Sequence, residues 1–471
     1  MKIADLEIKG ITSNSKEIKK GFIFVAIRGN RQDGNHFIKE AIIKGAGIVV
    51  VEKEVPQIEF SGKVIFWVVN DCRKFFAQAT HKFYGTPSDK IRVVGITGTN
   101  GKTTISYLIE MIAKKSGYDC GVIGTINYRF KGRTIAANNT TPGSGQLQNL
   151  LSKMYSQKVK YCAMEVSSHA LDQERVAGIN FSQAIFTNLT QDHLDYHKNL
   201  ENYFLAKTKL FRALPSTSSA IVNNDDKYSN RIKRLTKAKI LTYGIKNKSD
   251  VMAKDINFGI HSAEFSLVAS HINVRMKTNL TGRYNIYNIL AAVAWGISEK
   301  LPILDIKSAI EKFKNVPGRL QRVNSSKGFN IFVDYAHTPD ALFNVISALR
   351  PLVKGKIIVI FGCGGERDKL KRPQMGKVVT DLADYAVITS DNPRSEDPIQ
   401  IIKDIQQGIR KDNYCLVPER GKAIRKGLSL INKSDCLLIA GKGHENYQII
   451  KDKVMKFSDR KVVLQCLELM K

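Results

Sequence analysis

With 471 residues, the chain is long enough for two to four domains of roughly 150 residues each. Hydrophobic residues make up 43% of it and charged residues 25%, which excludes long disorder, collagen-like repeats and a membrane-embedded body. No apolar run approaches the roughly 18 residues of a membrane-spanning helix, and the first residues lack the pattern of an export signal. We therefore expect a cytoplasmic protein without membrane insertion.

The chain is strongly basic. Lysine and arginine total 73 against 43 for aspartate and glutamate, a formal net charge of +30, which raises nucleic acid, a membrane surface or anionic small molecules as partners. The lysines are spread out with no block of five or more basic residues, so a compositional bias explains them better than a nucleic-acid-binding segment. The 7 cysteines never form a CxxC pair, which excludes a zinc ribbon and a disulfide framework.

The first 90 residues alternate between strand and helix patterns. Apolar and β-branched runs predict strands, and apolar residues at helical spacing predict helices. The expected strands are residues 21–30, 47–54 and 63–69, and the expected helices are residues 36–46 and 73–84. The turn-rich sequence GTPSDK that begins at Gly85 predicts a domain boundary near residue 90.

A second α/β unit is expected from residue 91. It opens with a strand, a glycine-rich turn and a helix, which is the beginning of a βαβ unit. Pro317 and Gly318 interrupt the pattern and predict a second boundary, so this domain is residues 91–317. The expected strands are 91–97, 160–166, 183–189 and 219–224, and the expected helices include 103–117 and 288–298.

The last segment, residues 318–471, again alternates strands with helices. Its strands are short and almost continuously apolar, which is typical of a buried parallel sheet. The fold class is therefore α/β with three domains. The expected strands are 329–335, 356–362, 384–390 and 435–441, and the expected helices are 339–349, 374–383 and 398–409.

A candidate phosphate-binding loop, GITGTNGKTT, lies between the strand at 91–97 and the helix that follows. Gly98 and Gly101 would let backbone N–H groups approach phosphates, Lys102 would offset their charge, and Thr103 could hold Mg²⁺. The strict Walker spacing is absent, because Ile96 stands where that pattern has glycine. A chance glycine-rich turn is the competing interpretation.

Polar clusters follow further strands of the central and C-terminal segments. Glu165 ends one strand, and the loop 187–197, with Asp192 and His193, follows the next. Ligands collect at strand ends in open α/β sheets, and carboxylate oxygens suit Mg²⁺ better than zinc. Four C-terminal clusters also follow strands, although polar surface turns are an alternative: 334–339, 362–368, 391–394 and 441–445.

Ten motifs follow one another along nearly the whole chain: GITGTNGKTT, NNTTPG, MEVSSHAL, TNLTQDHLDYH, GRYNIYN, PGR, DYAHTPDAL, FGCGGERDKLKRPQMG, DNPR and AGKGHE. In this order the set resembles the Mur ligase family, and within it the diaminopimelate-adding members. The resemblance implies a UDP-substrate-binding domain (residues 1–90), a central P-loop-type ATP-binding domain (91–317) and a C-terminal Rossmann-like amino-acid-binding domain (318–471).

The resemblance also implies a reaction. ATP, as co-substrate with Mg²⁺ as cofactor, would phosphorylate the terminal D-glutamate of UDP-N-acetylmuramoyl-L-alanyl-D-glutamate to an acyl phosphate. The amine of meso-diaminopimelate would then attack and expel phosphate, in a step of peptidoglycan precursor synthesis carried out by a monomer. Lys207 matches a lysine that the family carbamylates with CO₂, which turns a cation into an anionic metal ligand.

By the same resemblance, site residues are assigned by function. The catalytic set is Lys102, Glu165, His193 and Lys207, and the metal set is Thr103, Glu165, His193 and Lys207. The ATP set is Gly98, Thr99, Asn100, Gly101, Lys102, Thr103, Thr104, Asn285, Arg319, Asp334 and His337. The UDP-sugar-peptide set is Ser13, Ser15, Asn139, Thr140, Thr141, Ser167, Gln173 and Arg175. The diaminopimelate set is Arg367, Asp391, Asn392, Pro393, Arg394, Gly441 and Glu445.

The resemblance implies that Arg394 discriminates between acceptors. Diaminopimelate differs from lysine by one carboxylate at its far end, so a selective pocket should supply a cation, preferably a bidentate arginine. Leaving Arg394 buried without that carboxylate would cost on the order of 2 to 5 kcal/mol. Two alternatives stay open: a lysine-adding ligase of the same family, and a basic P-loop protein that binds nucleic acid.

Overall fold

The structure, a computed structural model, describes residues 2–3, 6–29, 32–53 and 64–470. Residues 30, 54 and 63, at the ends of three predicted strands, lie outside these ranges. Across the described residues, no helix is both long and apolar enough to cross a membrane.

The N-terminal part is built on a parallel sheet of four described strands in the order β3-β4-β5-β6. Its core is formed by strand residues such as Phe24 and Val49, which are fully buried. The elements are β1 (Lys2–Ile3), β2 (Leu6–Glu7), β3 (Gly10–Thr12), η1 (Ser15–Glu17), β4 (Phe22–Val25), η2 (Gly34–Phe37), α1 (Ile38–Ile43), β5 (Ala46–Val51), β6 (Ile65–Val68) and α2 (Cys72–Phe83).

The central sheet has parallel strands from β8 to β15 and an antiparallel hairpin at each edge. In spatial order the strands are β10 (Arg133–Ala136), β9 (Asn127–Phe130), β8 (Cys120–Ile123), β11 (Tyr161–Glu165), β7 (Arg92–Thr97), β12 (Phe181–Phe186), β13 (Ser219–Asn223), β14 (Lys239–Gly244), β15 (Val251–Phe258), β16 (Ala263–Ala269) and β17 (Ile272–Thr278). Because β7 lies between β11 and β12, the loops after these three strands meet at one edge.

The helices of the central part cover this sheet. Helix α10 is the most buried, because it packs against α4 on one side and against β13, β14 and β15 on the other. A Cβ at Gly296 would lie 2.8 Å from Ile306 Cδ1, so glycine lets α11 approach α10 closely. The helices are α3 (Pro87–Lys90), α4 (Lys102–Lys115), α5 (Ser144–Ser156), α6 (Ser168–Asp172), α7 (Leu194–His197), α8 (Leu200–Arg212), α9 (Ser229–Leu235), α10 (Arg283–Ser298) and α11 (Ile303–Lys312).

The C-terminal part has the predicted α/β fold, with strand order β18-β19-β23-β20-β21-β22 and only β18 antiparallel. Every residue of β20 and β23 is buried, because α12, α13 and α14 cover one face and α15 and α16 the other. The elements are β18 (Gln321–Val323), β19 (Asn330–Asp334), α12 (Pro339–Leu349), η3 (Arg350–Leu352), β20 (Ile357–Phe361), α13 (Lys371–Leu382), β21 (Tyr385–Ile388), α14 (Pro398–Gln406), β22 (Tyr414–Leu416), α15 (Arg420–Leu430), β23 (Cys436–Ala440), β24 (Tyr447–Ile450), β25 (Lys453–Lys456) and α16 (Asp459–Leu469).

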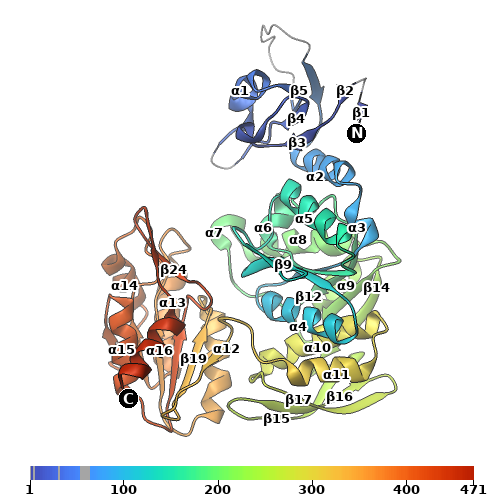
Figure 1. The fold of residues 1–471 in the computed structure, drawn as a ribbon. Helices are drawn as coiled ribbons and strands as arrows, with labels where there is room; N and C mark the ends of the chain where they lie inside the picture. Colours follow the sequence, from blue (N-terminus) through green and yellow to red (C-terminus); the bar gives the residue numbers. More distant parts are fainter. Residues whose placement is uncertain (1, 4–5, 30–31, 54–63, 471) are drawn as a thin grey trace.

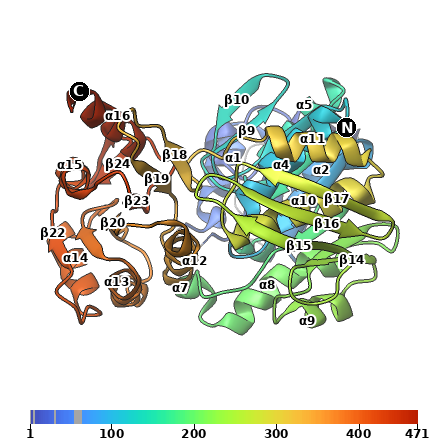
Figure 2. The ribbon, with the colours of Figure 1, turned by 90° about the horizontal axis from the view of Figure 1, so that it is seen from below.

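The three sheets follow one another through two connecting helices. Helix α2 lies between the N-terminal sheet and the central part, where it packs against β3 and α5 (Figure 1). Helix α12 lies on the side of the C-terminal part that faces the central part (Figures 1 and 2). Asp340 of α12 accepts hydrogen bonds from Asn100 Nδ2 at 2.9 Å and from Thr190 Oγ1 at 3.1 Å. The loops after β7 and β12 are therefore joined directly to α12. The domain boundaries near residues 90 and 317 stay predictions.

Candidate active site

The loop between β7 and α4 requires glycine at two positions. Gly98 and Gly101 have φ angles of 145° and 92°, in the region that side chains disfavour. A Cβ would lie 1.9 Å from Thr187 Oγ1 at Gly98 and 2.3 Å from Asn288 Oδ1 at Gly101. The loop therefore packs tightly against its neighbours and directs the start of α4 at the space above it, as a phosphate-binding loop does.

Two lysines converge on this loop. Lys102 Nζ donates to Gly98 O at 2.7 Å and to Thr99 O at 2.8 Å, and Lys207 Nζ of α8 donates to the same Gly98 O at 3.1 Å. Burial lowers the pKa of Lys102, and burial and then the charge of Lys102 hold the pKa of Lys207 well below its usual value. Lys207 is 1% exposed, so its neutral, nucleophilic amine is favoured.

Glu165, the last residue of β11, lies against the phosphate loop with 1% of its surface exposed. Its Oε2 accepts from Thr103 Oγ1 at 3.1 Å and from Thr125 Oγ1 at 2.9 Å, and its Oε1 accepts from Thr125 N at 3.0 Å. A carboxylate and two hydroxyls are the hard oxygen donors that Mg²⁺ prefers. No group of three or more His, Cys, Asp and Glu side chains forms a metal site within the described part of the chain.

His193 lies beside this group in a cluster of aromatic rings. Its ring is edge-on to that of His169, with 4.8 Å between centroids, and its Nε2 lies 3.4 Å from Asp192 Oδ2. Burial lowers the pKa of His193 to about 3. The ring is therefore neutral at neutral pH and keeps a lone pair for a metal ion.

A cavity of about 550 Å³ extends from the phosphate loop to the C-terminal part. Arg319 Nη2 donates to Thr103 Oγ1 at 3.1 Å, and its guanidinium lies 4.5 Å from the centre of the Tyr335 ring. Burial raises the pKa of Asp334 and lowers that of His337 to about 4. The predicted residues that line this cavity are Thr99, Asn100, Gly101, Lys102, Thr103, Thr104, Thr140, Glu165, Ser167, His193, Lys207, Asn285, Arg319, Asp334 and His337.

The central residues predicted for the UDP-sugar peptide form one hydrogen-bonded patch next to Glu165. Thr141 Oγ1 donates to Glu165 O at 2.8 Å, and Thr141 O accepts from Arg175 Nη1 at 2.9 Å. Gln173 Oε1 accepts from Arg175 Nε at 3.1 Å and from Nη2 at 2.6 Å. Ser167 N also donates to Thr141 Oγ1, and the hydroxyls of Thr140 and Thr125 are hydrogen-bonded, whereas Asn139 O accepts from Tyr128 Oη beside the patch.

The N-terminal members of that set are separate from this patch. Ser15 is 6% exposed and donates to Glu40 Oε2 at 2.8 Å, whereas Ser13 is exposed. Among the described residues, no hydrogen bond connects either serine with the central patch. The structure therefore brings together the central part of the predicted UDP-substrate set but not the whole of it.

Loops after β21 and β23 form a second polar site in the C-terminal part. Asn392 Nδ2 donates to Glu445 Oε2 at 2.8 Å, and Lys442 Nζ donates to both Asn392 Oδ1 and Glu445 Oε2 at 3.1 Å. Gly441 has a φ of 111°, and a Cβ there would lie 2.6 Å from Asp391 Oδ2. The carboxylates of Glu445 and Asp391 thus both lie close to the buried ammonium of Lys442.

The loop after β20 closes this site. Arg394 Nη1 donates to Gly365 O at 2.7 Å, and a Cβ at Gly365 would lie 1.9 Å from Pro393 O. Arg367, on the same loop as Gly365, is exposed. The predicted diaminopimelate residues are therefore gathered on three neighbouring strand ends.

Sequence analysis missed several residues at these sites. Asp340, in the motif DYAHTPDAL, was not singled out, but it accepts a hydrogen bond from Asn100 of the phosphate loop. Lys442, in the motif AGKGHE, was not singled out either, and it is fully buried. Asp225 accepts from Tyr287 Oη at 2.7 Å where both line the cavity. Tyr287 lies in the motif GRYNIYN, which was a usable signal; nothing local marks Asp225.

The fold and the cavity define an enzyme that uses a nucleotide: a phosphate loop in one α/β domain faces a separate polar site in another. Sequence patterns described as "Mur ligase family, catalytic domain", "Mur ligase middle domain" and "Mur ligase, glutamate ligase domain" match residues 7–84, 96–296 and 318–443. The chain belongs to the Mur ligase family.

Individual members of the family are similar to this chain over nearly its full length. The UDP-N-acetylmuramoyl-L-alanyl-D-glutamate--2,6-diaminopimelate ligase of Clostridium botulinum is 42% identical, over 98% of this chain and 95% of the relative. A solved structure of a ligase with the same name superposes with a TM-score of 0.71 at 32% identity, over 98% of this chain and 95% of that one. The MurF ligase of Thermotoga maritima in complex with ADP shares the fold, with a TM-score of 0.65 at 19% identity over 100% of both chains.

Proposed function

We propose that this chain is the ATP-dependent ligase that adds meso-diaminopimelate to UDP-N-acetylmuramoyl-L-alanyl-D-glutamate in peptidoglycan precursor synthesis. The observation that carries the proposal is the C-terminal polar site, where Asn392 donates to Glu445 and Arg394 is bound to the loop after β20, which lies between β21 and β23. The full-length relatives with this activity in their names support it. We further propose that the protein acts as a monomer in the cytoplasm.

The first step activates a carboxylate. A carboxylate oxygen of the terminal D-glutamate attacks the γ-phosphorus of ATP, the bond to the β-phosphate oxygen breaks, and ADP leaves. Lys102, held at the loop by the carbonyls of Gly98 and Thr99, supplies positive charge where the transferred phosphoryl group develops negative charge. Arg319 approaches the same point from the C-terminal part through its bond to Thr103.

The donor set beside the loop fits a magnesium ion. Thr103, Glu165 and His193 would hold it, and bound Mg²⁺ would offset the charge of the phosphates. Lys207 fits the proposed carbamylation, because burial lowers the pKa of its amine and so favours the neutral form, which attacks the carbon of CO₂. The product loses one proton and carries a negative charge, which the positive charge of Lys102 would stabilise.

The second step selects the acceptor. The free amine of the diamino acid attacks the acyl carbon, loses a proton, and phosphate leaves with the electrons of the broken C–O bond. The far end of diaminopimelate carries both an ammonium and a carboxylate. Glu445 and Asn392 suit the ammonium, and Arg394 suits the carboxylate. Lysine has no carboxylate at that end, so its binding would leave Arg394 without a carboxylate partner.

The experiment that tests this proposal measures ATP-dependent phosphate release with the UDP-muramoyl dipeptide and with meso-diaminopimelate, L-lysine or no amino acid. The ligated product is identified by mass spectrometry, and hydroxylamine is added without amino acid to trap the acyl phosphate. We expect the ligated product with diaminopimelate but not with lysine, and a hydroxamate in the reaction with hydroxylamine. Equal turnover with lysine would support the lysine-adding alternative, and no turnover with either amino acid would overturn the ligase.

A further inference from the structure

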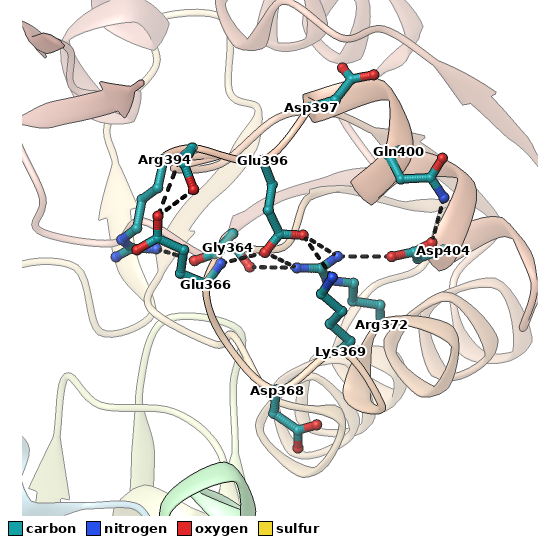
Figure 3. A network of polar contacts seen from close by, with 12 residues as sticks. Gly364, Glu366, Asp368, Lys369, Arg372, Arg394, Glu396, Asp397, Gln400 and Asp404 are labelled. Carbon is teal, nitrogen blue, oxygen red and sulfur yellow. Dashed lines mark hydrogen bonds and ion pairs between the residues drawn. The ribbon is translucent and has the colours of Figure 1, made fainter. Parts of the chain in front are cut away.

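Arg372, the second residue of α13, connects three separate segments of the C-terminal part. Its side chain is 0% exposed, and Nη1 and Nη2 donate to the two oxygens of Glu396 at 2.9 and 3.0 Å. Nη1 also donates to Asp404 of α14 at 2.8 Å (Figure 3). Two parallel hydrogen bonds fix both the position and the plane of the Glu396 carboxylate.

Glu396 carries this connection on to the loop after β20. Its Oε1 accepts the backbone N–H of Glu366 at 2.5 Å, and Arg372 Nη2 lies 3.4 Å from Gly364 O. The hydrogen bond from Arg372 lowers the pKa of Glu396 to about 2. Lys369 also approaches Glu396 at 3.6 Å, but it is 68% exposed, so solvent weakens its effect.

The loops after β20 and β21 meet here, and each contains a residue with an unfavourable positive φ angle. Glu366 and Arg394 have φ angles of 54° and 53°, which residues with a Cβ keep only where their surroundings enforce it. Arg394 Nη1 is in turn bound to the carbonyl of Gly365. Because Gly365 is followed by Glu366, a shift of Glu366 moves the group that orients the Arg394 side chain.

We infer that Arg372, acting through Glu396, is a positioning residue that holds Arg394 at the spacing which binds the distal carboxylate of the acceptor. It thereby sets the preference for a diamino acid with two carboxylates over one with a single carboxylate. This inference rests on the proposed function. Arg372 lies behind the loops, with its guanidinium bound to protein groups, and so it acts through Arg394.

The chemistry of arginine is essential to this role. Lysine in its place would keep the charge but offers a single point of attachment, so the Glu396 carboxylate could rotate. Glu396→Gln keeps the shape but has no charge and one acceptor oxygen in place of two, so at least one bond from Arg372 or from the Glu366 N–H is lost and the others weaken. Either change should loosen Arg394 without touching the phosphate loop.

The test compares kcat/KM for meso-diaminopimelate and for L-lysine in the wild type, Arg372→Lys and Glu396→Gln, at saturating ATP and UDP substrate. We expect the ratio of the two values to fall by about tenfold or more in both variants. The change should come from a higher KM for diaminopimelate, with the KM for ATP unchanged. Glu396→Gln alters no volume, so it reports on the inference even where Arg372→Lys fails to fold.

Asp404→Asn is the matched control, because it removes the other ion pair of Arg372 and leaves the Glu396 connection in place. It should lower the melting temperature but keep the wild-type ratio. An unchanged ratio in the two test variants, or an equal fall in Asp404→Asn, overturns the inference alone. A wild type that does not use diaminopimelate overturns the proposed function and the inference with it.

Discussion

Replacing Arg420 by methionine should destabilise the C-terminal part by about 3 to 5 kcal/mol, because it leaves a buried carboxylate unpaired. Arg420 and Asp459 are both 0% exposed, and the guanidinium binds the two carboxylate oxygens at 2.7 and 2.8 Å. Arg420 Nη2 also donates to Ala440 O at 2.9 Å, at the end of β23. The pair therefore supports a strand end that carries the acceptor site.

Scanning calorimetry or far-ultraviolet circular dichroism is the suitable assay, because Trp67 and Trp295 both lie outside residues 318–471. At about 2 to 4 °C per kcal/mol for a domain of this size, the melting temperature should fall by about 6 to 20 °C. The double variant Arg420→Met with Asp459→Leu should recover most of the loss, since an apolar pair needs no partner. A decrease in the free energy of unfolding below about 1 kcal/mol in Arg420→Met would refute this reasoning, because an ion pair exposed to solvent contributes only that much.

Three further predictions concern the phosphate loop, buried histidines and Lys207. Gly98→Ala should strain the loop by about 1 to 3 kcal/mol, because the added Cβ would meet Thr187 Oγ1. ATP binding should weaken roughly tenfold or more. An unchanged Kd for ATP in calorimetric titration would contradict this. Burial lowers the pKa of His337 from 6.5 to about 4 and that of His444 from 6.5 to about 3. Because both histidines bind a proton more readily in the unfolded chain, the folded state loses stability as the pH drops below 6.5 towards 4. The loss is up to about 1.4 kcal/mol per pH unit for each histidine. Denaturation of His337→Asn across this range should show a shallower slope, and an equal slope would count against it. Lys207→Ala should lower kcat by about a hundredfold and remove any response to added bicarbonate; a wild-type rate that is the same with and without bicarbonate would argue against carbamylation.

Much of the fold could be predicted because its signals are local. Helix α12 has the predicted limits, Pro339 to Leu349, since Thr338 caps the helix through the Ala341 N–H and proline occupies its first position. The phosphate loop is equally local: a buried strand, glycines with left-handed backbone and a helix follow one another directly. Motif spacing alone therefore indicated the part of the site that one βα unit builds.

The antiparallel edge formed by β15, β16 and β17 was missed, although β16 carries a period-two pattern with Ala263, Phe265, Leu267 and Ala269 buried. Its strands lie in the chain between the parallel strand β14 and the helix α10, and no glycine-rich or charged motif marks them. Arg372 and Arg420 were missed for another reason. Their acidic partners lie 24 and 39 residues away, so nothing in the surrounding sequence marks them as buried. Asp340 likewise reaches Asn100 across 240 residues.

The acceptor preference tests the central claim most directly. The measurement is the ratio of phosphate release with meso-diaminopimelate to that with L-lysine, in the wild type and in Arg394→Ala, with the UDP-muramoyl dipeptide and ATP present. The proposed mechanism predicts a strong preference for diaminopimelate in the wild type, lost in Arg394→Ala through a rise in KM, while the KM for ATP is unchanged. A preference that survives the removal of Arg394, or a wild type that uses lysine equally well, would contradict the assignment of this site.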